Sequence, residues 1–261
     1  MLDFSFRYQE FEILLLFIVR MGGFVFAAPF YSNTSVPSQF KIGLTIFLGY
    51  LTYYVTLPHQ AVVYETVLGY SMLVIKELIV GILVGWAANI CISIVFFAGR
   101  IVDMDIGFSM VNAMDPTTRE NATISGFYYQ YAVMLMLLIT GMHRYVIEAI
   151  VETYTLIPIS MAQFNLSKMY DTLLFYLAEY VSIGFRICMP VFAAILIVNV
   201  VLGILAKVAP QMNMFAVGMQ IKVITGLGVM VLTTMMLPYV AQFIDTQTRK
   251  MVVSMVEAMI P

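Results

Sequence analysis

The side chains that could carry out chemistry are few in this sequence, and they are scattered. Asp103 and Asp105 stand two residues apart, but carboxylates so placed in a loop are usually solvated. Cys91 and Cys188 lie in apolar runs, where a free cysteine behaves as a small hydrophobe, so we expect no disulfide framework and no metal cluster. There is no Gly-x-x-x-x-Gly-Lys-Ser/Thr run for a nucleotide and no His-Glu-x-x-His zinc motif. We therefore expect neither an enzyme nor a bound cofactor.

The composition predicts a membrane protein. Charged residues make up 11% of the 261 residues, whereas an average soluble domain carries about 25%. Hydrophobic residues make up 62%, and the mean hydropathy is +0.94. These values exclude a cytosolic enzyme, a DNA-binding module and a disordered regulator, and a net charge of -2 provides no basic field for nucleic acid.

Several charges lie inside the apolar runs, namely Arg20, Lys76, Glu77, Glu179 and Arg186. Each would cost about 2.5–3.5 kcal/mol at the middle of a bilayer if it faced lipid. Glu179 and Arg186 are seven residues apart, so they share one face of a helix. Snorkelling to an interface is one explanation. We favour burial against other protein or a wet pore, because charges in several runs would all have to snorkel.

Six apolar runs predict an all-α, membrane-associated fold with long kinked helices and helical hairpins. They cover residues 11–30, 41–57, 66–98, 126–142, 172–206 and 217–244. A membrane span needs about 20 residues, so the third and fifth runs, as straight helices of about 50 Å, exceed the hydrocarbon core of about 30 Å. We expect Gly81 and Gly85 to weaken the third run and Pro190 to kink the fifth. If all six runs span, lysine and arginine divide equally between the two sides and predict no orientation. We expect the N-terminal run to be retained, because its flanks do not match a signal peptide.

Three stretches depart from simple spans. The first runs from Gly99 through Asp103 and Gly107 to Pro116; it interleaves polar residues with large apolar ones, and we expect it to pack into protein or to line a cavity. Its methionines, Met104, Met110 and Met114, would suit a deformable seal. The second stretch, from Leu202 to Lys222, indicates the turn of a helical hairpin. In the third, Glu77 precedes Gly81 and Gly85 at four-residue spacing, a ladder that lets another helix approach closely.

With these stretches in view, the chain resembles the FliR/SctT family of flagellar and type III secretion export-gate components along nearly its whole length. The order and spacing of the matching motifs carry the resemblance, and the last motif looks more flagellar than injectisome. These motifs are Arg20 with Pro29-Phe30 and Val36-Pro37; Glu77-Gly81-Gly85; Gly99-Arg100 with Asp103; Gly107-Phe108-Ser109-Met110; and Ala209-Pro210-Gln211-Met212-Asn213-Met214-Phe215.

The resemblance implies one unit, 1–261, with a FliP-like part over 1–185 and a FliQ-like hairpin over 186–261. It also implies a pore-closing plug loop over 103–116. The site residues that follow fall into four groups: plug residues Asp103, Met104, Asp105, Gly107, Phe108, Ser109, Met110, Met114, Asp115 and Pro116; buried charges for assembly Arg20, Glu77, Arg100, Glu179 and Arg186; helix-packing glycines Gly81 and Gly85; and hairpin-turn residues Lys207, Pro210, Gln211, Asn213 and Phe215.

The partners implied are several copies of FliP and FliQ in a helical assembly, with FlhB and FlhA as neighbours. Unfolded export substrates would pass through, membrane lipid would surround the assembly, and no nucleic acid is expected. The location implied is the bacterial cytoplasmic (inner) membrane at the flagellar basal body.

Two other functions remain open at this point. A secondary transporter would use Glu77 or Glu179 as an intramembrane proton or cation site. Transporters often carry interrupted helices in matching positions of two halves, whereas the over-long runs here are the third and fifth of six. A structural membrane scaffold without a conduit is the third possibility, and it would lack any leak on removal of the plug.

Overall fold

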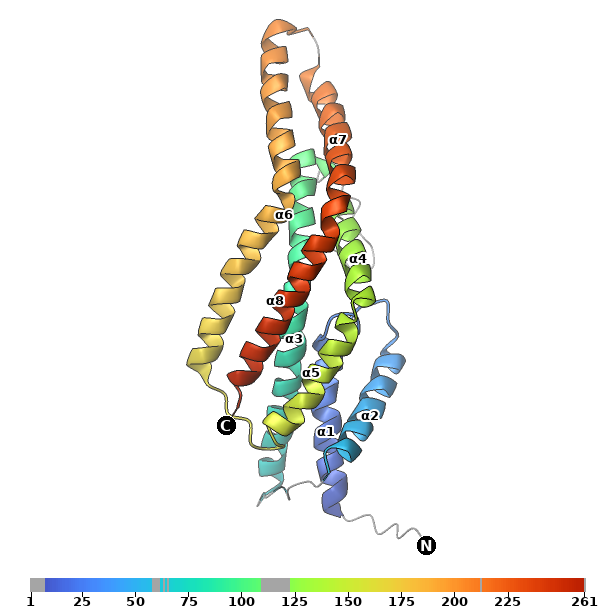
Figure 1. Cartoon of the computed structure of the whole chain (residues 1–261), viewed down its shortest axis with the longest axis vertical. Coiled ribbons are helices and arrows are strands. Elements are labelled where there is room, and N and C mark those ends of the chain that lie inside the picture. The colour runs from blue at the N-terminus through green and yellow to red at the C-terminus, as the bar shows by residue number, and fades with distance from the viewer. Residues whose placement is uncertain are drawn as a thin grey trace. The chain divides into compact units, whose positions relative to one another are not determined.

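In the computed structural model, the described residues are 8–57, 62, 64, 66–108, 123–211 and 213–260, and they form helices without strands (Figure 1). The protein is therefore all-α, as the apolar runs predicted. The elements in chain order are α1 (Tyr8–Ala27), α2 (Ser38–Val55), α3 (Val67–Ile106), α4 (Ile124–Ile139), α5 (Met142–Leu156), α6 (Leu166–Val208), α7 (Met214–Thr233), the short 3-10 helix η2 (Thr234–Met236) and α8 (Leu237–Glu257).

The chain forms two compact units, and each is discontinuous in sequence. Unit 1 combines residues 1–91, 141–176 and 246–261, and unit 2 combines residues 92–140 and 177–245. Each unit therefore draws on segments from both sides of position 185. The expected FliP-like and FliQ-like parts are defined by resemblance to other proteins, whereas these two units are defined by contacts within the chain. The division at position 185 therefore stays a prediction.

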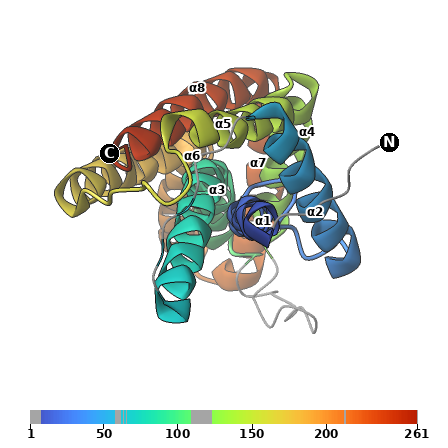
Figure 2. The ribbon, with the colours of Figure 1, turned by 90° about the horizontal axis from the view of Figure 1, so that it is seen from below.

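Unit 1 is built around α1, which lies between α2 and α3 (Figures 1 and 2). The face of α1 that carries Leu16, Met21 and Phe24 is fully buried, together with Val84 of α3 and Ile150 of α5. The buried residues of α2 are Lys41, Thr45, Gly49 and Thr52, and a Cβ added to Gly49 would come within 2.9 Å of the Ile18 side chain. Small residues thus set the spacing of α1 and α2.

Unit 2 contains the end of α3, α4, most of α6, α7, η2 and the start of α8. Close approaches at glycine hold it together. A Cβ on Gly99 would lie 2.3 Å from the Cα atom of Gly126, and a Cβ on Gly184 would lie 2.7 Å from the Phe97 ring. The α6 and α7 helices meet where a Cβ on Gly218 would lie 3.2 Å from Leu202.

Two expectations about long helices need correction. The α3 helix runs unbroken from Val67 to Ile106, so Gly81 and Gly85 do not interrupt it. They face another helix instead, whose close packing offsets the weak helix propensity of glycine. The helix also continues through Gly99 and Asp103, which we expected in irregular backbone; regular structure ends only at Gly107, which has a positive φ of 96°. Pro190 lies inside α6, which stays helical and is bent in Figure 1.

The expectation about the last apolar run also needs correction. The run at 217–244 divides between α7 and α8, joined by η2, and α8 continues to Glu257. Another helix, α5, follows α4 after Gly141 and was not marked by an apolar run. Hydropathy identified the most apolar stretches but not the helical residues beyond them.

The structure describes fewer long apolar helices than the six runs suggested. Three helical segments are long and apolar enough to cross a membrane, Val67–Ile106, Leu166–Val208 and Phe215–Glu257, and α4 with α5 adds a fourth if that pair counts as one broken span. The first two helices do not meet this test. The equal count of lysine and arginine on the two sides assumed six spans, so it predicts nothing about orientation for this set of helices.

Candidate functional site

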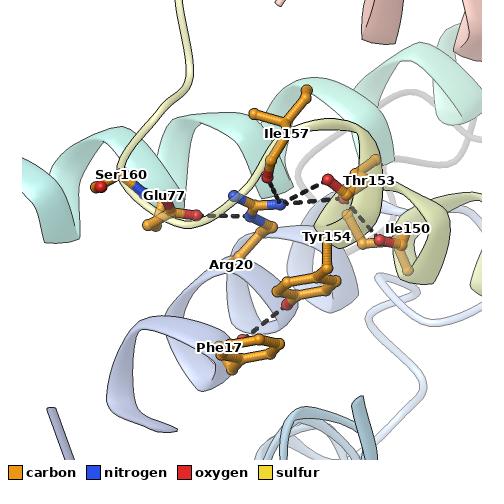
Figure 3. A network of polar contacts seen from close by, with 8 residues as sticks. All are labelled: Phe17, Arg20, Glu77, Ile150, Thr153, Tyr154, Ile157 and Ser160. Carbon is orange, nitrogen blue, oxygen red and sulfur yellow. Dashed lines mark hydrogen bonds and ion pairs between the residues drawn. The ribbon is translucent and has the colours of Figure 1, made fainter. Parts of the chain in front are cut away.

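The most buried polar cluster of unit 1 joins α1, α3 and the end of α5 (Figure 3). Arg20 of α1 and Glu77 of α3 are both fully buried, and the Arg20 Nε atom donates to Glu77 Oε2 at 2.6 Å. The backbone N–H of Ser160 donates to the other carboxylate oxygen at 2.9 Å. Both oxygens of the buried carboxylate are therefore satisfied, as a charge inside a protein requires.

A second nitrogen of Arg20 reaches the C-terminal end of α5, whereas the Nη2 atom is buried without a hydrogen-bond partner among the described residues. The Nη1 atom donates to the carbonyl oxygens of Thr153 at 3.1 Å and Ile157 at 3.0 Å. The carbonyl end of a helix carries partial negative charge, so a cation there is favourable. The Tyr154 ring lies 4.5 Å from the guanidinium carbon, and its hydroxyl donates to the carbonyl oxygen of Phe17 at 2.9 Å. One side chain thus connects three helices.

Gly81 and Gly85 explain how Arg20 comes within reach of Glu77. A Cβ on Gly81 would lie 2.0 Å from the carbonyl oxygen of Arg20, and one on Gly85 would lie 2.8 Å from the backbone nitrogen of Ala28. The α1 and α3 backbones therefore approach more closely than any side chain would allow. Glu77 stands one turn before Gly81 on the same face of α3, so the ladder aligns the carboxylate with Arg20.

At the end of α3, Asp103 contacts the beginning of α4 within unit 2. Its side chain is 1% exposed, and its two carboxylate oxygens accept from the backbone N–H of Ser125 at 3.1 and 3.2 Å. The first N–H groups of a helix have no partner within the helix, so Asp103 serves as a cap supplied from another helix. The prediction that Asp103 and Asp105 are solvated is therefore wrong for Asp103.

The other residues assigned to the plug divide between described and undescribed positions. Met104 is 71% exposed, Asp105 is half-buried, and Gly107 and Phe108 follow the last turn of α3. Ser109, Met110, Met114, Asp115 and Pro116 lie outside the described residues.

The three other charges assigned to assembly are less buried within the single chain. Arg100 and Arg186 are exposed, and Glu179 is half-buried. The Arg100 guanidinium lies 5.6 Å from the ring centroid of Phe96. Their burial by other protein stays a prediction, and the structure does not pair Glu179 with Arg186 among its described residues.

The residues assigned to the hairpin turn lie between α6 and α7. Lys207 is in the last turn of α6, Pro210 and Gln211 follow it, and Asn213 precedes α7. The Asn213 side-chain oxygen accepts from the backbone N–H of Ala216 at 3.3 Å, so it caps α7. Phe215 is 67% exposed at the start of that helix.

Long apolar helices, a buried ion pair and closely packed glycines define an all-α membrane protein. By sequence comparison, the chain belongs to the family of bacterial export proteins, family 1, which it matches over residues 11–248.

Curated relatives carry names that agree with this family. The chain is 29% identical over 219 residues to the flagellar biosynthetic protein FliR of Bacillus subtilis, and the match covers 82% of each chain. It is 24% identical to the FliR protein of Escherichia coli, over 87% of this chain and 85% of the relative. It is also 26% identical to the surface presentation of antigens protein SpaR of Shigella flexneri, over 85% and 86% of the two chains. These names place the chain among components of the flagellar export apparatus.

The sequence revealed the individual charges of the buried network but not their pairing. Arg20 and Glu77 are 57 residues apart, and only the contact between α1 and α3 brings them together. The pair Gly22-Gly23 offered a signal for that contact, because a Cβ on Gly23 would lie 2.5 Å from the carbonyl oxygen of Leu78. No comparable signal marked Asp103 as a cap.

Proposed function

We propose that this chain forms, together with FliP and FliQ, the conduit through which unfolded substrates leave the cell during flagellum assembly. The assembly would sit in the bacterial inner membrane at the flagellar basal body, next to FlhB and FlhA. In it, residues 1–185 would take the place of a FliP-like subunit and residues 186–261 that of a FliQ-like hairpin. Membership of the export family supports this proposal, as do the FliR names of its curated relatives.

The observation that carries the proposal is the apolar surface left uncovered by the chain itself. In α6, only 17% of the most apolar window is buried within the chain, and the same fraction holds for the segment Phe215–Glu257. The corresponding window of α3 is 56% buried. Helices with so little internal cover need lipid or other subunits around them, and a multi-subunit conduit provides both.

Within this conduit, residues 103–116 would form the plug that closes the pore. The described part of the segment is compatible with that role, because α3 ends at Ile106 and exposes Met104 beside the buried cap made by Asp103. A methionine side chain can repack as a substrate passes.

Replacing residues 109–116 with a glycine–serine linker of equal length tests the plug. The change leaves Asp103 and its contact with Ser125 in place, so α3 and α4 keep their connection. We expect membranes that contain the altered chain with FliP and FliQ to become leaky to ions, measured as dissipation of a potassium gradient in vesicles. Assembly is checked by the yield of the complex. A tight membrane with normal assembly would contradict the plug role.

The transporter hypothesis is weaker for Glu77 than the sequence suggested. Both of its carboxylate oxygens accept hydrogen bonds, one from Arg20 and one from Ser160. A carboxylate that carries a transported proton or cation must be able to exchange its partner, and this one is fully buried in a fixed pair. Glu179 stays the remaining candidate for that alternative.

A further inference from the structure

A cavity of about 230 Å³ lies within unit 2, between α4, α6, η2 and α8. Most of its lining is apolar and includes Pro190 and Phe243. The polar lining groups are the Arg186 guanidinium and the hydroxyl groups of Tyr129, Thr233 and Tyr239. An apolar cavity with a few convergent polar groups is the usual form of a small-ligand site.

Arg186 gives the cavity an unpaired positive charge. Within the part of the chain that the structure describes, no carboxylate lies at salt-bridge distance from its guanidinium. The residue is exposed, so an anion from the surroundings can reach its guanidinium. A cation among apolar groups in a membrane protein calls for an anionic partner.

Pro190 adds a polar group to the same wall. Proline has no backbone N–H, so the carbonyl oxygen four residues earlier in α6 loses its usual helical donor. That carbonyl belongs to Arg186 itself. The position therefore offers a guanidinium donor and a backbone acceptor that lacks its usual helical donor.

The sequence of α6 places this cavity at the level of lipid headgroups. Residues 187–206 contain no charge, and Arg186 and Lys207 bracket them. Twenty helical residues span about 30 Å, which is the thickness of the hydrocarbon core. Tyr239, which is 75% exposed, suits the interface because its ring is apolar and its hydroxyl is polar. Arg186 would then lie at the boundary between hydrocarbon and water.

We propose that this cavity binds an anionic phospholipid, with the phosphate group against the Arg186 guanidinium and the Tyr239 hydroxyl. An acyl chain would run along the exposed apolar face of α6 beyond Ile187, where Leu196 is 49% and Val200 64% exposed. A headgroup that carries hydroxyl donors, as in phosphatidylglycerol, would also donate to the Arg186 carbonyl, which lacks its usual helical donor. The inference goes beyond the proposed conduit and concerns the chain whether or not it closes a pore.

Native mass spectrometry of the chain purified in detergent together with FliP and FliQ tests the site, with phosphatidylglycerol and phosphatidylcholine added in turn. We expect the wild type to retain phosphatidylglycerol in preference to phosphatidylcholine. Arg186→Gln should lower that preference about fivefold, the effect of one cation at a membrane surface. Arg186→Lys keeps the charge and should keep most of the preference.

Lys76→Gln is the matched control, because Lys76 is exposed on α3, carries the same charge and does not line the cavity. We expect this control to leave the preference unchanged. Equal retention of phosphatidylglycerol by Arg186→Gln and the wild type would overturn the proposal, and so would an equal loss in the control.

A photo-crosslinking residue at Phe243, tested in cells that contain the whole export apparatus, distinguishes lipid from protein in the cavity. Phe243 lines the cavity and is 39% exposed. An adduct with phospholipid agrees with the proposal. Adducts with a neighbouring subunit alone would mean that an acidic side chain of that subunit faces Arg186, and they would overturn it.

Discussion

At the scale of single residues, Arg20 and Glu77 form a fully buried ion pair within unit 1. Taking two charges out of water is costly, and their attraction offsets that cost only if the remaining donors and acceptors are also satisfied. Here the Ser160 N–H satisfies the second oxygen of Glu77, and carbonyls at the end of α5 satisfy Arg20 Nη1, whereas Arg20 Nη2 is buried without a partner in the part of the chain that the structure describes. The pair therefore fixes where α5 ends against α1 and α3.

Removing either member of this pair should destabilise the chain strongly. We expect Arg20→Leu and Glu77→Gln each to lower stability by about 3–5 kcal/mol, because each leaves an uncompensated buried charge. The measurement is the fraction of the chain, purified together with FliP and FliQ, that remains monodisperse on size exclusion after heating in detergent. Lys76→Gln should change stability by no more than about 0.5 kcal/mol, since its side chain is exposed. If all three variants behave alike, the pair is not a stabilising contact.

Asp103 should matter through its cap on α4. We expect Asp103→Ala to cost about 0.5–2 kcal/mol in the stability of the first turn of α4, and Asp103→Asn to cost less, because asparagine keeps an acceptor for the Ser125 N–H. Hydrogen exchange at the amides of Ser125 and its neighbours measures the effect. Met104→Ala serves as the control, because Met104 is the next residue and is largely exposed. Unchanged exchange in Asp103→Ala would show that the cap is dispensable.

How far the sequence could predict these residues depends on the range of their contacts. The charges inside apolar runs stood out one by one, because their cost in lipid depends only on local surroundings. Their partners were hidden, since Arg20 finds Glu77 and α5 only through tertiary packing. The seven-residue spacing of Glu179 and Arg186 put them on one helix face, but it did not predict their contacts. The structure leaves Arg186 exposed.

At the scale of elements, the close contact between α1 and α3 organises unit 1. The two backbones approach closely at Gly23 of α1 and at Gly81 and Gly85 of α3. The four-residue spacing of the glycines in α3 predicted such a close contact with another helix. The sequence could show that some helix would approach this face, but not that it would be α1. Glycine in a long helix suggested a break, whereas the close packing that the glycines permit keeps α3 intact.

Adding one methyl group at this contact should be harmful. In Gly81→Ala the new Cβ would lie 2.0 Å from the carbonyl oxygen of Arg20, a backbone atom that cannot move without shifting α1. We expect a loss of about 1–3 kcal/mol, typical of overpacking. Gly43→Ala is the matched control in α2: a Cβ there meets nothing within 4 Å, and the change should stabilise the helix by up to about 1 kcal/mol. The thermal midpoints of the two variants should therefore shift in opposite directions. A Gly81→Ala variant as stable as the wild type would mean that α1 and α3 are not in tight contact.

At the scale of the whole molecule, the chain itself leaves much of its apolar helix surface uncovered. The chain itself covers little of its long apolar helices in unit 2. Exposed aliphatic side chains lie along both α6 and α7. The amino-acid composition predicted a membrane environment from the scarcity of charge. It could not say how much of the apolar surface meets lipid and how much meets other subunits, because both are equally apolar.

Expression of the full chain alone and together with FliP and FliQ is the most direct test of the central claim, that other subunits of the export apparatus cover these helices. The readout is the mass and yield of the purified membrane particle. We predict that the chain accumulates only in the co-expressing cells and is recovered in a defined complex with both proteins. An equal yield of stable, monomeric chain in both cases, with no FliP or FliQ bound, would contradict the account.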